Sequence, residues 1–500
     1  MGVRNAPPRT GYMLESLRGL GYTPATALAD LVDNSISANS EKICVHFEWA
    51  GAKSWVRIVD DGDGMDDATL EAGMRLGARD PRAKRNFGDL GRFGLGLKTA
   101  SFSQARRLTV ASRCKGGPIV CLRWDLDSMD MEPSVEWPLF EGTALGSEYL
   151  IEPLKSMKSG TIVLWENLDR IVTEGFTADD MIELADHVEA HFGMTFHRLI
   201  GGLQPELKLF LNSRPVMPWD PFLMEHPGKA HEGRECRILY TTGVTAQCHV
   251  LPHHDMLKPY EQKKAAGPGG WIQQQGFYVY RNRRLLLAGG WLGLGDGGKP
   301  WHRDEAHRLA RIRLDIPNSA DAEWKINILK STSSPPVRLR RQLHQLAHET
   351  REIAKRVFAH RSHISPASGS RSNALIDVWQ ARHSPQGTSY RISRNHDLVA
   401  SILKRAGPMK PDIISLLRLI EETVPVQRIW LDTTEDKEIP RTGFMDASEN
   451  EIRDTLTSIF EALVKFRGLS QTEARERLGR TSPFDQYPDQ IATLEVKGAK

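Results

Sequence analysis

Two polar residues near the amino terminus have the types and spacing of a site that activates water beside a metal ion. Asp30 and Asn34 are four positions apart in the segment TPATALADLVDNSISA, residues 23–38. If this segment is a helix, both side chains leave the same face, one turn apart. A carboxylate can act as a general base, and Mg²⁺ accepts oxygen ligands such as an amide together with substrate phosphates. Taken alone, however, the pair is better explained as a polar surface stripe.

A turn rich in acid and glycine, DGDGM at residues 61–65, follows an expected strand that ends at Asp60. A carboxylate fixed at the end of a strand can accept a hydrogen bond from an exocyclic amine, such as that of adenine. Gly62 and Gly64 would let a ligand approach the backbone closely. A tight acidic turn explains the segment equally well in isolation, whereas the spacing of an EF-hand calcium loop is absent.

A third segment, GRFGLGLK at residues 91–98, places glycines before a helix that we expect to begin near Leu97. Amide groups at the start of a helix point toward an anion, and the helix dipole adds to the attraction. A Rossmann site would need a strand directly before the glycines, and RNFGDL does not resemble one. The sequence GxxxxGK[ST] does not occur either, so a Walker site is unsupported. A plain flexible loop remains an alternative for this segment alone.

The elements that must position these groups follow from capping and alternation. Thr23 and Pro24 are typical of an N-cap and a first helical position, which predicts a helix over residues 23–38. Alternating residues predict strands over 43–49, 55–60, 108–112, 119–124 and 161–165, the first two paired as a hairpin. Helices mixed with antiparallel strands indicate an α+β fold and not a doubly wound parallel sheet.

The length and composition indicate several globular domains. A chain of 500 residues with 40% hydrophobic and 26% charged residues favours two to four domains and excludes disorder over most of its length. The expected domains are 1–200, 201–361, a linker at 362–392 that is rich in Ser, Pro, Gly and Arg, and a mostly helical 393–500 without recognisable chemistry. In the second domain we expect strands over 207–211, 276–281 and 310–316, and a helix after Pro336.

The cysteines and the apolar segments bear on the cellular setting. The five cysteines form no CxxC pair, which argues against a disulfide scaffold and fits a reducing cytoplasm. Neither the amino-terminal segment nor any other apolar stretch has the length of a signal peptide or a membrane span. We therefore expect a cytoplasmic protein with no membrane partner.

The formal charge of +3 conceals a segregation of charge along the chain. Residues 79–115 carry ten basic and two acidic residues, a local charge of +8, while 281–313 and 338–361 each carry +5 and 432–454 carries −5. Basic segments of this kind predict surfaces that bind phosphates. One run could contact nucleic acid or form a strand with one solvated basic face; it comprises Tyr278, Tyr280, Arg281, Arg283 and Arg284.

Taken in order, the three segments resemble the GHKL ATPases, a superfamily that includes gyrase-type topoisomerases, a heat-shock chaperone, histidine kinases and MutL. ADLVDNSISA is similar to the first box of that family, with Asp30 where a catalytic Glu usually stands and Asn34 matching the Asn that binds Mg²⁺. DDGDGM resembles the adenine box. The resemblance implies that Asp60 contacts adenine, supported by Gly62, Gly64 and Met65.

The same resemblance extends to the phosphates and to a second domain. GRFGLGLKTAS is similar to the hinge of the phosphate-binding lid, which implies nucleotide contacts from residues Gly91, Gly94, Gly96, Leu97 and Lys98. Thr161 in SGTIVLWENL matches a late element that supports the adenine end. GFYVYRNRRLL and EWKINILKSTSSPP are similar to the transducer domain, which resembles ribosomal protein S5 in fold. Its lysine at the γ-phosphate corresponds to Lys330, or failing that Lys325.

Within the superfamily the chain most resembles MutL and the MORC ATPases, especially prokaryotic MutL/MORC-like proteins encoded beside restriction-modification genes. The resemblance implies a Bergerat-type ATPase that binds ATP and Mg²⁺, closes a lid over residues 76–93 and pairs as an ATP-dependent homodimer. The expected role is a nucleotide-gated clamp or switch on DNA, in restriction or phage defence, with a separate nuclease partner.

Hydrolysis is expected to be slow, because Asp30 is one methylene shorter than the usual Glu and a misplacement of about 1 Å can cost on the order of a hundredfold in rate. Three alternatives remain: a protein-remodelling chaperone, a sensor kinase, and an ATP-binding scaffold without turnover.

Overall fold

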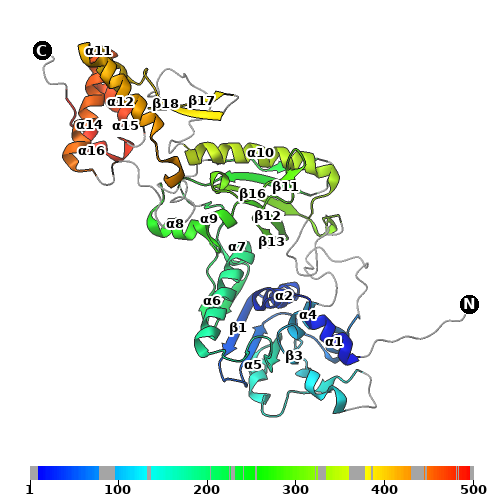
Figure 1. Cartoon of the computed structure of the whole chain (residues 1–500). Helices are drawn as coiled ribbons and strands as arrows, with labels where there is room; N and C mark the ends of the chain where they lie inside the picture. The colour runs from blue at the N-terminus through cyan, green and yellow to red at the C-terminus, as the bar shows by residue number, and fades with distance from the viewer. Residues whose placement is uncertain are drawn as a thin grey trace, which may run out of the picture. The chain divides into compact units, whose positions relative to one another are not determined.

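The computed structural model forms two compact units, Met1–Arg356 and Val357–Lys500. The residues that it describes are 10–77, 96–131, 137–202, 204–224, 226, 231–239, 241, 243–253, 256–320, 323–324, 334–359, 378–384, 387–429, 444, 447–479, 481 and 484–495. Figure 1 shows the course of the chain through these elements.

The first sheet has eight strands among the described residues, in the order β5-β4-β3-β6-β2-β1-β7-β8. All neighbours are antiparallel except β1 and β7, which are parallel. The predicted hairpin of β1 and β2 is confirmed. The strands are β1 Lys42–Glu48, β2 Trp55–Asp60, β3 Arg107–Arg113, β4 Val120–Asp125, β5 Phe140–Glu141, β6 Gly160–Glu166, β7 Lys208–Leu211 and β8 Arg214–Pro215.

Helices cover this sheet and share its core. Alternate strand residues such as Ile43, Val45, Val56 and Ile58 pack with α1, α2, α3, α4 and α6 in one cluster, and Figure 1 shows α1, α2 and α4 close together over the sheet. Leu154 of α5 packs in a separate cluster with β3 and β6. The helices are α1 Thr10–Arg18, α2 Pro24–Ser37, α3 Asp67–Met74, α4 Gly96–Phe102, α5 Pro153–Ser156, α6 Ala178–Thr195 and α7 His197–Ile200.

Helix α2 begins and ends close to the predicted limits. The Thr23 side chain accepts a hydrogen bond from the amide of Thr26, and Pro24 occupies the first helical position. These contacts satisfy a backbone donor that a helix start otherwise leaves unpaired. Leu28, Leu31 and other apolar residues of α2 are buried, so the helix has one face in the core.

The second sheet follows in the order β10-β11-β16-β12-β13, with β9 paired to β11. Helix α10 lies along this sheet in Figure 1 and buries Leu339, Leu343 and Ala347. The strands are β9 His231–Glu232, β10 Cys236–Arg237, β11 Thr245–Val250, β12 Gly276–Arg281, β13 Arg284–Ala288 and β16 Ala310–Ile316; β14 Gly295–Asp296 and β15 Lys299–Pro300 form a separate pair. The helices are α8 Pro259–Ala266, α9 Gly270–Gln273 and α10 Val337–Ala359.

One expected strand belongs to a different sheet. The segment 207–211, which we expected in the second domain, is β7 and pairs in parallel with β1 of the first sheet. Its residues Leu209 and Leu211 are buried in the same core as Ile43 and Val45, so the apolar alternation of β7 is satisfied there. The first sheet therefore extends past residue 200 to β8.

The second unit is mostly helical, as predicted, but the expected linker at 362–392 is partly wrong. Its described residues include a hairpin of β17 and β18, whose register pairs Trp379 with Ile392 and Ala381 with Tyr390. The apolar pair of Trp379 and Ile392 favours a sheet despite the polar composition around it. The elements are β17 Trp379–Ser384, β18 Gly387–Ile392, α11 Asp397–Arg405, α12 Lys410–Glu422, α14 Glu449–Glu461, α15 Gln471–Gly479 and α16 Pro488–Ala492.

Candidate functional site

Helix α2 carries the first pair of predicted site residues. Asp30 is 7% exposed, and its Oδ2 accepts a 2.8 Å hydrogen bond from the hydroxyl of Tyr22. Burial of the Tyr22 phenol, together with the neighbouring Asp30 carboxylate, raises the pKa of Tyr22 far above its ordinary value. The hydroxyl therefore stays protonated and remains a donor to Asp30. Asn34, one turn further along, is exposed and free of the core.

The carboxylate of Asp60 ends β2 and is held from two directions. Its Oδ2 accepts a 2.8 Å hydrogen bond from Ser35 Oγ of α2, and its Oδ1 accepts a 3.0 Å bond from the amide of Gly62. Asp60 is 4% exposed. Burial raises the pKa of Asp60, and the hydrogen bonds from Ser35 and Gly62 oppose that rise. Because Ser35 and Asp30 lie on the same helix, the bond from Ser35 to Asp60 fixes the carboxylates of Asp30 and Asp60 relative to each other.

The glycines after Asp60 let the backbone approach the end of β3. Gly64 has φ +70°, and a Cβ there would lie 1.9 Å from the carbonyl oxygen of Arg113. The next amide, that of Met65, donates a 2.8 Å hydrogen bond to Ser112 Oγ. Only glycine fits such a close approach in this conformation without a shift of the backbone.

Thr161 lies beside this turn, where β2 and β3 end and β6 begins. It is the partner of Asp60 in the register of β2 and β6, and its Oγ1 lies 2.8 Å from Ser112 Oγ. The structure thus brings Asp60, Gly64, Met65 and Thr161 together, and their contact with adenine stays a prediction.

The start of α4 meets the Asp30 carboxylate. A Cβ at Gly96 would lie 3.7 Å from Asp30 Oδ2, and Leu97 is half-buried. Lys98 is 2% exposed, and its Nζ donates to the carbonyls of Gly73 and Arg75 at 2.7 and 3.0 Å. A phosphate contact by Lys98 would have to replace these bonds, which hold the C-terminal end of α3.

Several predicted residues lie outside the described part of the chain. They are Gly91 and Gly94, most of the expected lid at 76–93, and the candidate γ-phosphate lysines Lys325 and Lys330. Their contacts with phosphate stay predictions.

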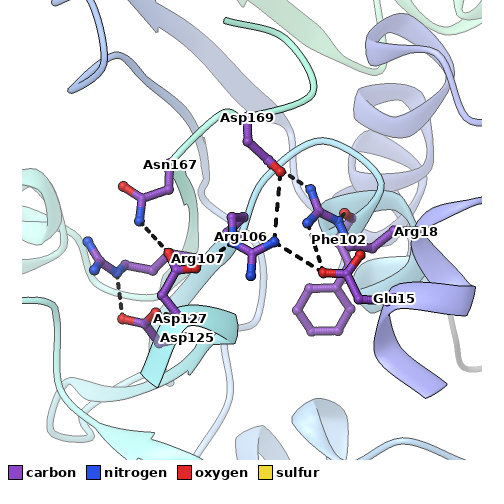
Figure 2. Close-up of polar contacts among 9 residues, drawn as sticks. All are labelled: Glu15, Arg18, Phe102, Arg106, Arg107, Asp125, Asp127, Asn167 and Asp169. Carbon is purple, nitrogen blue, oxygen red and sulfur yellow. Dashed lines mark hydrogen bonds and ion pairs between the residues drawn. The ribbon is translucent and has the colours of Figure 1, made fainter. Parts of the chain in front are cut away.

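The opposite end of α4 is anchored by the polar network in Figure 2. Arg18 of α1 is buried and donates from Nε to the carbonyl of Phe102 at 2.9 Å. Arg106 bonds to Glu15 of α1 and to Asp127, at 3.1 and 2.5 Å. The cation of Arg18 satisfies a carbonyl that the end of a helix leaves unpaired. The network fixes the helix that begins beside Asp30.

The same contacts correct the expectation of a basic face in residues 79–115. Among the described basic residues of that segment, Lys98 binds backbone carbonyls, Arg106 and Arg107 pair with carboxylates, and Arg113 donates to backbone carbonyls including that of Gly117. Lys115 is exposed. Apart from Lys115, the described side chains position elements of the first sheet, so this described part of the segment presents less positive surface than its count of charge suggests.

The aromatic and basic run on β12 and β13 is also placed differently from either expectation. All six residues of β12 are buried, because the strand lies between β16 and β13 and is covered on both faces. Tyr278 and Tyr280 are 0% exposed, and Arg281 and Arg284 are 1% and 5% exposed. The run therefore forms neither a stacking surface for nucleic acid nor a solvated basic face.

Three residues of the site were missed from the sequence: Tyr22, Ser35 and Ser112. Ser35 lies within the predicted helix, but its bond to Asp60 depends on how α2 packs on β2. The register of β3 and β6, which pairs Ser112 with Thr161, would have indicated Ser112 once those strands were known to be neighbours.

The sequence that forms most of this site matches a known class of protein. Residues 22–161 match the family model described as histidine kinase-, DNA gyrase B- and HSP90-like ATPase. The chain thus carries a GHKL-type ATPase domain, and the predicted family and α+β fold class are confirmed.

The chain is also similar to the DNA mismatch repair protein MutL of Koribacter versatilis (strain Ellin345), with 35% identity over 102 residues. The match covers 19% of this chain and 16% of that protein. Together, the family and this similarity place the domain close to MutL and support ATP binding. Across the described residues, no helix combines the length and apolarity needed to cross a membrane.

Proposed function

We propose that the protein binds ATP, hydrolyses it slowly and acts as a nucleotide-gated clamp or switch. The observation that carries the proposal is the buried Asp60 carboxylate at the end of β2. It accepts hydrogen bonds from the Gly62 amide and from Ser35, which lies on the same helix as Asp30. Both ends of a nucleotide site are thereby fixed to α2. The GHKL family match supports the nucleotide-binding part of the proposal.

In this proposal Asp60 accepts a hydrogen bond from the exocyclic amine of adenine. Gly62, Gly64 and Met65 shape the wall beside the base, and Thr161 orients that wall through its contact with Ser112. A tightly packed pocket with one acceptor would favour adenine over a base that presents an oxygen at the same position.

The donor set of α2 fits Mg²⁺. Asn34 offers an exposed amide oxygen one turn from the Asp30 carboxylate, and Mg²⁺ takes oxygen ligands from a few side chains plus substrate phosphates. When bound, the ion would neutralise charge on the phosphates. Asn34 would hold it, and Asp30 would accept a proton from the attacking water.

The contact between Tyr22 and Asp30 favours slow turnover and also supports one alternative. It orients the carboxylate, but it occupies one of the two oxygens of Asp30. If that bond persists with nucleotide bound, the protein would act as an ATP-binding scaffold without turnover. The two functions predict opposite effects when the hydroxyl of Tyr22 is removed.

The roles of the second domain and of the phosphate loop are part of the same proposal. We assign the domain the duty of a transducer, with Lys330 as the residue that senses the γ-phosphate and Gly91, Gly94, Gly96 and Leu97 along the phosphates. A single ammonium group is suited to detect the presence of the terminal phosphate.

Action on DNA by an ATP-dependent homodimer is the further part of the proposal. The MutL relative is named as a DNA mismatch repair protein. Exposed cations on α10, Arg341, Lys355 and Arg356, could bind phosphates without reading sequence. Salt-sensitive DNA binding would count against the alternative of a protein-remodelling chaperone. A setting in restriction or phage defence, a nuclease partner and a cytoplasmic location stay predictions.

Nucleotide titration of a matched pair of variants tests the proposal. We expect Asp60→Asn to weaken binding of Mg²⁺-ATP at least about tenfold, because an amide replaces the buried acceptor. Asp63→Asn is the control: Asp63 lies in the same turn but is exposed and bonded to Asn39 at 2.7 Å. Asp30→Asn should retain binding and lose phosphate release. Failure of the unaltered protein to bind ATP, or equal affinities for Asp60→Asn and the unaltered protein, would overturn the proposal.

A further inference from the structure

A buried ion pair joins the nucleotide-site helix to the second sheet. Nε of Arg284, the first residue of β13, donates to both carboxylate oxygens of Asp33 on α2 at 3.2 and 3.1 Å. The two side chains are 6% and 2% exposed, although they lie 251 positions apart in the sequence. The Nη1 of Arg284 also donates to the carbonyl of Leu285 at 2.8 Å.

The turn that presents Arg284 is held in an uncommon conformation. Asn282 and Arg283 connect β12 to β13 with φ of 47° and 68°, the left-handed region that residues with a side chain rarely adopt. Arg283 bonds to the carbonyl of Arg198 and to Glu206. Two consecutive arginines of one turn therefore contact α2 and the segment between α7 and β7. Positive φ at both connecting residues is the usual geometry of a two-residue hairpin turn, and it fixes the direction in which Arg284 leaves the strand.

The surroundings of the pair are suited to keep it intact. His191 of α6 has its pKa lowered to about 4 by burial and then by the positive charge of Arg284, so it is neutral near pH 7. The guanidinium also lies over the ring of Phe196, 6.0 Å from its centroid. A buried ion pair is seldom an efficient source of stability, because an apolar pair of similar volume often serves as well. Its distinctive contribution is a fixed direction between the two elements.

That direction bears on the proposed site because of the position of Asp33. It follows Asp30 by three residues and directly precedes Asn34, so all three lie on one side of α2. A helix moves as a rigid element over such a short distance. A displacement of the Asp33 side chain by β13 would therefore change the angle at which Asp30 and Asn34 face the nucleotide.

We propose that Arg284 is a positioning residue that orients α2 for ATP hydrolysis and couples the nucleotide to the second sheet. This inference rests on the proposed ATPase function and adds the contact through which the site communicates. Among the described residues Arg284 bonds to Asp33 and to none of the proposed reacting groups, and its charge also acts on Tyr22, the donor to Asp30. It is therefore a positioning residue. The pair would transmit in both directions: nucleotide at Asp30 and Asn34 would alter β13, and movement of β13 would alter the rate of hydrolysis.

A double-mutant cycle separates this role from simple stabilisation. Arg284→Met and Asp33→Asn alone each leave a buried polar or charged group without its partner, so both should destabilise the fold. The double variant removes both charges and should recover most of the urea midpoint. We expect it to bind ATP within about threefold of the unaltered protein while kcat falls about tenfold to a hundredfold, as a shift of the base of about 1 Å would cause.

Two further variants keep the test decisive. Arg284→Lys retains the charge but loses the Nη1 bond to the carbonyl of Leu285, which helps to fix the direction of the guanidinium. It should therefore lower kcat with little loss of stability, and it serves as the test if the double variant fails to fold. Arg313→Met is the matched control, since Arg313 pairs with Glu235 and Asp315 on the second sheet and does not contact α2. It should leave kcat unchanged.

The outcomes distinguish this inference from the proposed function. If the unaltered protein binds no ATP, the proposed function fails. If it binds and hydrolyses ATP and both the double variant and Arg284→Lys keep its kcat, only the coupling fails. If the unaltered protein binds ATP without turnover, the amide hydrogen exchange of β13 tests the coupling. A non-hydrolysable ATP analogue should change this exchange in the unaltered protein and not in the double variant. Equal responses of the two proteins would overturn the coupling.

Discussion

Replacing Tyr22 by Phe removes the hydroxyl that donates a hydrogen bond to the proposed catalytic carboxylate and leaves the packing of the ring in place. Tyr22 is 8% exposed and belongs to the core of the first unit, and its hydroxyl donates to Asp30 Oδ2 at 2.8 Å. Phe keeps the ring and loses the donor. The variant therefore tests the orientation of Asp30 without changing its charge or its position in the sequence.

The structure sets the size of the expected effects. A hydrogen bond to a charged group contributes about 1.5–3 kcal/mol, and Asp30 is 7% exposed, so the free energy of unfolding should fall by about that amount. The carboxylate then loses one of the contacts that orient it, and a displacement of about 1 Å costs on the order of a hundredfold in rate. We expect kcat to fall tenfold to a hundredfold on that estimate, with the KM for ATP nearly unchanged, since adenine is assigned to Asp60.

Steady-state phosphate release at saturating Mg²⁺-ATP and urea unfolding measure the two effects. Tyr260→Phe is the matched control: its hydroxyl donates to Glu261 at 2.9 Å, but the side chain is 65% exposed. A kcat for Tyr22→Phe within twofold of the unaltered protein, when Asp30→Asn has none, would refute the orienting role. A rise in kcat would instead mean that the hydroxyl restrains Asp30, which supports the scaffold alternative.

Three other perturbations test the pocket and its surroundings. Gly64→Ala should destabilise the fold by more than about 1–3 kcal/mol and abolish ATP binding, because the left-handed φ and a clash with backbone act together. Gly51→Ala is the control, since Gly51 has φ +59° and nothing within 4 Å of the added Cβ. Equal urea midpoints for the two variants would contradict the steric argument. Ser35→Ala should lower the free energy of unfolding by about 1 kcal/mol and weaken ATP binding several-fold, whereas unchanged affinity in a nucleotide titration would show that Asp60 needs no donor from α2. The pKa of His191 is lowered to about 4, so the unfolded chain binds a proton more readily than the folded chain does. The contribution of His191 to the free energy of unfolding is present above about pH 6.5 and is lost as the pH falls toward 4. The loss is at most about 3 kcal/mol because the side chain is half-buried. His191→Gln should flatten this dependence in urea unfolding between these values, and an unaltered slope would assign it to another group.

The parts of the fold that could be predicted are those whose signals are local. The start of α2 follows from Thr23 and Pro24, and the β1–β2 hairpin follows from alternation within a short stretch of chain. The glycines at 62 and 64 likewise indicated a close approach to the backbone, although the sequence suggested a ligand as the approaching group. Gly62 approaches the carbonyl of Ala38 and Gly64 that of Arg113, and both contacts depend on how segments that are distant in sequence pack together.

The charges could not be predicted from their number, because pairing and burial decide how they act. The segment 281–313 has an excess of basic residues, yet Arg281, Arg308 and Arg311 are almost fully buried. A strand covered on both faces accepts a long arginine when its stem packs with apolar neighbours. Alternation within β12 gives no sign of this, since periodicity does not reveal a second covering layer.

The hairpin of β17 and β18 shows the converse error. Its composition favoured a linker, but its apolar residues pair across the strands, as Trp379 does with Ile392. Composition averages over a window and therefore loses the register, while the register determines whether two weakly apolar strands share a face.

The three contacts of α2 limit how a nucleotide signal can leave the site. Tyr22 lies two residues before the helix and bonds to Asp30, so it moves with α2. Ser35 ties the helix to Asp60 at the end of β2, within the same core. The bond from Asp33 to Arg284 joins α2 to a different sheet. A large rotation of α2 about its axis would displace Ser35 from Asp60 and disrupt the adenine site, so a signal that preserves binding is limited to a shift of about 1 Å at Asp30 that keeps the bond of Ser35. The contact between Asp33 and Arg284 is the one among the three that such a movement would strain, which is why the transmission is assigned to it.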